Sequence, residues 1–127
     1  MGLFRFQVRN PNRDRDTDAG RLQRLHRMLD ELRVEIERER NGLRDRYEKL
    51  AADAAFSYQA MENDGVEASM SSKIDDMTDT MIRYSGRIQA LDRQIGFVIG
   101  LRGQVEGFFR GDAGEAAPSS AVRPGPV

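Results

Sequence analysis

Few side chains in this sequence could do chemistry, and the most suggestive are three aspartates. Asp75, Asp76 and Asp79 form a D-D-x-x-D pattern, which can hold magnesium diphosphate when the carboxylates converge on hard cations. The neighbouring Ile74 and Met77 fit an apolar seam, so the three carboxylates fall on the outer, solvated face of a helix. No second acidic motif accompanies them. We therefore expect no metal site here.

Nucleophiles and bases are equally scarce. His26 is the only histidine and stands between Arg24 and Arg27, where one imidazole beside cations is poor metal chemistry. The chain has no cysteine, which excludes a disulfide framework, a thiolate zinc site and a cysteine nucleophile. We expect no catalytic residue and no cofactor, and hence a protein that is not an enzyme.

The second half of the chain carries an unbroken apolar periodicity. Its spacings alternate between four and three residues, which is the 3.5-residue repeat of a coiled-coil seam, and Arg102 is its one polar member. The seam consists of Met70, Ile74, Met77, Met81, Tyr84, Ile88, Leu91, Ile95, Val98, Arg102, Val105 and Phe109.

The first half carries a noisier version of the same repeat. A polar gap at Glu39 and Arg40 separates its two parts, but the seven-residue phase survives the gap. Its seam is Leu22, Leu25, Leu29, Leu32 and Ile36, followed by Leu43, Tyr47, Leu50, Ala54, Tyr58 and Met61. A break at Asn41-Gly42 would instead give a three-helix bundle; the preserved phase favours one continuous helix.

These patterns predict an all-α fold, a long antiparallel two-helix coiled-coil hairpin over 18–110. The first helix is expected over 18–62, an Asn-Asp-Gly turn over 63–65, and the second helix over 66–110, where Gly111 stops it. A short, extended N-terminal segment and loop precede it over 1–17. The Gly-, Pro-, Ala- and Ser-rich residues 111–127 read as a disordered tail.

Composition bounds the class of protein. The 127 residues are 39% hydrophobic and 32% charged, with a net charge of −1, and mean hydropathy is −0.65. We expect one soluble, cytoplasmic domain, with no membrane-spanning run and no signal peptide. The bias of 18 Arg over 2 Lys is typical of a GC-rich bacterial genome.

The end of the second predicted helix is apolar on more than one side. Glycines recur there at spacings of four, three and four, and each costs a helix about 1 kcal/mol against alanine. A close approach of another backbone would offset that cost, so we predict a self-association or partner interface and a homo-oligomer, a dimer or higher. Its residues are Gly96, Phe97, Ile99, Gly100, Gly103, Gly107 and Phe108.

Two further stretches suggest docking. Acidic residues gather around the predicted turn, at Glu62, Asp64, Glu67, Asp75, Asp76 and Asp79, and form an acidic tip. Aromatic and basic residues alternate near the N-terminus and form a docking segment of Leu3, Phe4, Arg5, Phe6, Val8 and Arg9. The Arg-rich open end of the hairpin could instead meet an anionic surface, either a membrane or a nucleic acid.

The leading functional hypothesis is a non-enzymatic structural scaffold or adaptor that acts by helix-mediated self-association and partner docking. One alternative is a secretion or export chaperone-like hairpin that holds a client helix. Another is a binder of a membrane or nucleic acid through the Arg-rich end, with affinity that falls steeply as salt rises. The expected shape resembles small bacterial coiled-coil hairpins, including secretion and flagellar-export adaptors, although no shared motif accompanies the likeness.

Overall fold

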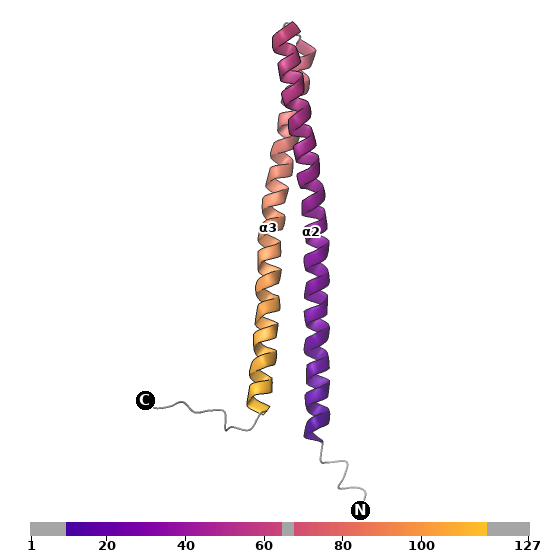
Figure 1. Cartoon of the computed structure of the whole chain (residues 1–127), viewed down its shortest axis with the longest axis vertical. Coiled ribbons are helices and arrows are strands. Elements are labelled where there is room, and N and C mark those ends of the chain that lie inside the picture. The colour runs from indigo at the N-terminus through magenta and orange to yellow at the C-terminus, as the bar shows by residue number, and fades with distance from the viewer. Residues whose placement is uncertain (1–9, 65–67, 117–127) are drawn as a thin grey trace, which may run out of the picture. The chain divides into compact units, whose positions relative to one another are not determined.

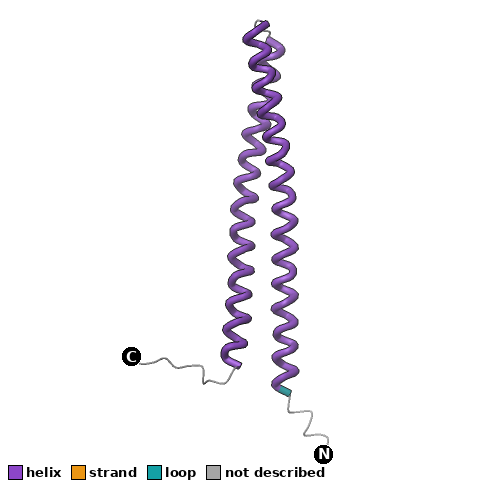
Figure 2. The backbone as a smooth tube through the Cα atoms, viewed as in Figure 1, coloured by secondary structure: helices purple, strands orange, loops and turns teal. Residues whose placement is uncertain are grey.

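Two long helices make up the described part of the protein. The computed structural model describes residues 10–64 and 68–116, in which α2 spans Pro11–Asp64 and α3 spans Ala68–Ala116. The helices pack against each other and no strand occurs in these residues (Figures 1 and 2). The predicted all-α helical hairpin is therefore confirmed.

α2 begins earlier than the sequence analysis expected, at Pro11 rather than at residue 18. The Oδ1 atom of Asn10 accepts a hydrogen bond from the backbone N–H of Asn12 at 2.8 Å, which is the geometry of an N-cap. Pro11 then occupies the first helical position, where its missing N–H costs nothing. The predicted loop over 10–17 was wrong because Asn-Pro served as a helix start rather than a turn.

α2 continues without a break through Asn41 and Gly42, so the three-helix alternative is excluded. It also runs through Asn63 to Asp64, where the predicted turn over 63–65 should have begun. A helix that already carries many backbone hydrogen bonds extends easily, so two further residues join it despite low helix propensity. Residues 65–67, which include the predicted turn glycine, lie outside the described residues.

α3 also outruns its prediction, because it ends at Ala116 rather than at residue 110. Gly111 has no positive φ and stays helical, which a glycine can do at a cost of about 1 kcal/mol. The predicted disordered tail is therefore wrong for 111–116. Residues 117–127 lie outside the described residues, as do residues 1–9.

The chain divides into two compact units. Unit 1 combines Met1–Leu32 with Val98–Val127, and unit 2 is Arg33–Phe97. Within unit 1, position 26 pairs with 106 and position 30 with 102, so rising numbers on α2 meet falling numbers on α3. The two helices are therefore antiparallel in this unit. Its buried residues are Leu29 and Val98.

Unit 2 holds the larger share of the buried side chains. Ala54 comes from α2, and Met77, Leu91 and Ile95 come from α3; Leu91 is the most enclosed, at 1% exposed. All the predicted seam positions of α3, in both units, are buried or half-buried, including Arg102. The inward-facing line of α3 is therefore the one that its spacing predicted.

The inward-facing line of α2 differs from the prediction. Leu22, Leu29, Ile36, Leu43 and Leu50 do turn inward, but Leu25 and Leu32 are 44% and 38% exposed. The alternate inward positions fall one residue later, at His26, Arg33 and Arg40, which are half-buried. Leu25 and Leu32 were expected in the seam because they are apolar, but polar side chains take the inner positions.

Candidate interaction surface

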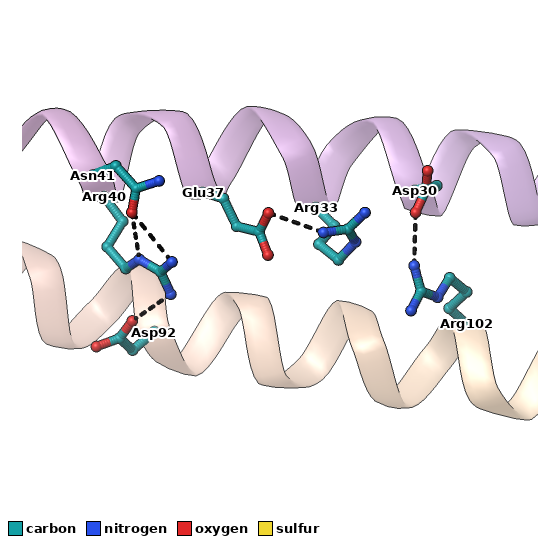
Figure 3. A network of polar contacts seen from close by, with 7 residues as sticks. All are labelled: Asp30, Arg33, Glu37, Arg40, Asn41, Asp92 and Arg102. Atoms are coloured by element: carbon teal, nitrogen blue, oxygen red, sulfur yellow. Dashed lines mark hydrogen bonds and ion pairs between the residues drawn. The ribbon is translucent and has the colours of Figure 1, made fainter.

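Unit 1 has one polar side, built on two contacts between α2 and α3. Arg102 Nη1 donates to Asp30 Oδ1 at 2.6 Å, and the dashed line in Figure 3 marks this pair. His26 Nε2 lies 3.0 Å from Glu106 Oε2. The hydrogen bond from His26 lowers the pKa of the Glu106 carboxyl below its ordinary value, and the positive charges of Arg102 and Arg110 act in the same direction.

The His26–Glu106 pair borders an open hollow. The hollow is lined by Leu22, Gln23, His26, Val105, Glu106, Phe109 and Arg110. One imidazole and one carboxylate resemble part of an acid–base site, but both side chains are more than a third exposed. A general base needs a third group to orient it and a pocket that excludes water. The arrangement is that of an exposed hydrogen-bonded pair at the edge of the seam.

The opposite side of unit 1 is an apolar groove. Its lining residues come from both helices and are almost all apolar: Leu22, Leu25, Leu29, Leu101, Gln104, Val105 and Phe108. Phe108 is 65% exposed at its rim. On α2, Met28 lies between the exposed Leu25 and Leu32 and is itself 59% exposed, so the apolar surface extends along this helix. We call Leu25, Met28, Leu32, Leu101 and Phe108 the apolar flank.

The α2 half of this flank was not predicted from the sequence. Leu25, Met28 and Leu32 stand three and four residues apart, which is itself a helical stripe. Met28 lies off the predicted seam, and its apolar side chain was the sequence signal for a second, exposed stripe on α2. Reading Leu25 and Leu32 as core left Met28 as an isolated exposed residue.

All seven residues of the predicted glycine interface are exposed, and the interface itself stays a prediction. A Cβ built on Gly96, Gly100, Gly103 or Gly107 meets nothing within 4 Å among the described residues, so all four stand open. Phe97 is 67% exposed and Phe108 65%, while Ile99 is 43% exposed. By helical spacing, Phe108 shares a side with Leu101, whereas Ile99 falls nearer the side of Glu106.

In unit 2, ion pairs join α2 and α3 along both edges of the seam. Arg40 Nη1 donates to Asp92 Oδ1 at 3.1 Å (Figure 3), and Arg44 Nη2 lies 3.6 Å from Asp92 Oδ2. Across the other edge, Arg87 Nε donates to Glu39 Oε2 at 2.9 Å. This hydrogen bond raises the pKa of the Arg87 guanidinium above its ordinary value.

The remaining candidate sites belong to unit 2 or lie outside the described residues. Glu62, Asp75, Asp76 and Asp79 of the acidic tip are exposed in unit 2. The side chains of Asp64 and Glu67, and the whole N-terminal docking segment of Leu3, Phe4, Arg5, Phe6, Val8 and Arg9, lie outside the described residues. Among the described residues, no three His, Cys, Asp or Glu side chains come together as metal ligands do.

Neither α2 nor α3, within its described residues, contains a stretch long and apolar enough to cross a membrane. Comparison with protein-family models, with curated proteins and with solved structures finds no significant match. Function is therefore inferred from the surfaces of this chain.

Proposed function

We propose that the protein is a non-enzymatic structural or adaptor protein, and that it acts through association of its helix faces. The apolar flank of unit 1 is the self-association surface, and the chain works as a homo-oligomer. The observation that carries this proposal is the exposure of Leu25, Met28 and Phe108 beside a groove that nothing in the described chain fills.

The thinness of the core supports the same proposal. Only Leu29 and Val98 are buried in the described part of unit 1, and no polar or charged residue is buried. Two helices bury little surface against each other, and long amphipathic helices gain most of their stability from packing against further elements. A second pair of helices over the flank would turn a two-helix contact into a four-helix one.

The acidic residues of unit 2 are the proposed docking surface for another protein. The exposed carboxylates of Glu62, Asp75, Asp76 and Asp79 lie in unit 2, away from the flank residues in the sequence. Clustered exposed charge speeds encounter with a partner of opposite sign and contributes less to final affinity. This acidic surface therefore suits a protein partner with a basic surface.

Polar substitution of the flank tests the self-association. Phe108→Gln and Leu25→Gln replace exposed apolar side chains with a residue that favours helices, so the fold should survive. We expect both variants to sediment as lighter species than the wild type at equal concentration, with unchanged helicity by circular dichroism.

Phe56→Gln is the matched control, because Phe56 is 76% exposed on α2 in unit 2. It should leave the mass unchanged. Equal loss of mass in all three variants, or no loss in the two flank variants, would overturn the assignment of the surface.

A further inference from the structure

The apolar stripe on α2 is bordered by two opposite charges. Arg24 and Glu31 are exposed, and each stands one residue before a leucine of the stripe, Leu25 or Leu32. Neither charge takes part in an ion pair among the described residues. Arg24 and Glu31 are seven residues apart on one helix, which is two turns, and so too far to pair with each other.

We infer that α2 pairs antiparallel with α2 of a second copy of the chain, about a two-fold axis that passes beside Met28. This inference rests on the proposed self-association and specifies its geometry. A two-fold interface is self-complementary, so a contact from one residue to another is repeated in the reverse sense. With Met28 opposite itself, Leu25 of one copy lies one residue, about 1.5 Å, from the level of Leu32 of the other, so the two leucines pack together.

The charges follow the same register. When Met28 faces Met28, Arg24 of one copy lies one residue, about 1.5 Å, from the level of Glu31 of the other, within reach of their long side chains, and this pairing occurs twice. A parallel two-fold arrangement would instead place the charged edge of one α2 beside the leucine edge of the other, so that neither Arg24 nor Glu31 would meet an opposite charge. Charges placed beside leucines disfavour that arrangement, whereas complementary charges set orientation and register.

Helix geometry makes the two pairings compatible. Going around α2, Met28 lies between the side that carries Arg24 and Glu31 and the side that carries Leu25 and Leu32. In an antiparallel helix pair, equivalent flanking positions of the two helices meet on the same side. The charged residues thus meet along the outer edge and the leucines along the inner edge. The inner edge adjoins the apolar groove that Leu101 and Phe108 line. In this arrangement the second copy covers that groove.

Charge reversal and charge exchange test the register. Arg24→Glu alone, or Glu31→Arg alone, creates two like-charge contacts per dimer. Either variant should raise the dimer dissociation constant on the order of tenfold. The double variant R24E/E31R restores two opposite-charge pairs and should return the constant to near the wild-type value. Arg38→Glu is the matched control, because Arg38 is exposed two heptads beyond Arg24 and should have no effect.

Single-cysteine cross-linking gives an independent readout, because the chain has no cysteine of its own. A two-fold axis beside position 28 brings the two Met28→Cys side chains within disulfide reach. Mild oxidation should convert this variant to a covalent dimer much faster than Gln89→Cys, which places the thiol at an exposed position on α3 in unit 2.

The outcomes separate the two proposals. A wild type that is monomeric at all concentrations overturns the proposed self-association and this inference with it. A wild-type dimer in which R24E/E31R stays as weak as the single variants overturns the antiparallel register alone. A wild-type dimer in which Met28→Cys cross-links no faster than Gln89→Cys does the same.

Discussion

Arg102 occupies an inward-facing position of α3 and places Nη1 2.6 Å from Asp30 Oδ1 on α2. It is the one polar member of an otherwise apolar line, between Val98 and Val105. Its side chain is only 27% exposed, whereas that of Asp30 is 44% exposed. An inward-facing position of α3 is thus occupied by a charged side chain whose partner, Asp30, remains in contact with solvent.

Arg102→Leu should therefore stabilise the protein. The substitution adds apolar contact in the seam, and Asp30 remains in contact with water, so its charge is not stranded. We expect the free energy of unfolding to rise by about 1 kcal/mol, measured by urea unfolding followed by circular dichroism. Arg93→Leu, at an exposed position of α3, is the control and should change little. A lower urea midpoint for Arg102→Leu would show that the ion pair is worth more than the packing.

The His26–Glu106 contact should make stability depend on acidity. The pKa of Glu106 is lower in the folded protein than its ordinary value of 4.5, chiefly through the hydrogen bond from His26. Its contribution is therefore fully present above about pH 4.5 and is lost as the pH falls through the folded-state value. The difference in Tm between the wild type and Glu106→Gln should be smaller at about pH 3 than at about pH 6. An equal difference at both pH values would contradict this account.

Gly103→Ala separates the glycine face from the apolar flank. A Cβ at this position meets nothing within 4 Å, so alanine should raise the free energy of unfolding by about 1 kcal/mol through helix propensity. Because the proposed α2–α2 contact leaves the glycines of α3 uncovered, the oligomer mass should not change. Loss of mass in this variant would mean that another backbone approaches the glycine face closely, as the sequence analysis expected.

Asn10 should be a functional N-cap for α2. Asn10→Ala removes the acceptor at 2.8 Å from the Asn12 N–H and should cost about 1 kcal/mol, whereas Asn10→Ser keeps an acceptor and should cost less. Amide hydrogen exchange in the first turn of α2 reports this directly. Equal protection in the two variants would place the helix start elsewhere.

The two-helix architecture was predictable because it depends on long-range periodicity, which a few local exceptions do not disturb. The seven-residue phase from Leu22 to Leu50 and the seam of α3 both point inward as expected. Helix ends depend on single residues, and there the prediction went wrong at Asn10 and at Gly111. Each residue type serves both helices and turns, so its type alone could not decide.

The candidate surface was only half predictable. Exposed Phe97 and Phe108 follow from their position off the α3 seam. The α2 side could not be read in the same way, because apolar Leu25 and Leu32 compete with their neighbours His26 and Arg33 for the inner positions. His26 takes the inner position and places Nε2 3.0 Å from Glu106 Oε2 on α3. That pairing depends on the register between two segments that are far apart in the sequence.

The most direct test of the central claim is solution mass by light scattering after gel filtration, across a concentration series of the wild-type chain. The self-association account predicts a stable multiple of 14.4 kDa that dissociates only on strong dilution. A mass of 14.4 kDa at every concentration would contradict it, because the apolar flank would then be exposed without a second copy to cover it.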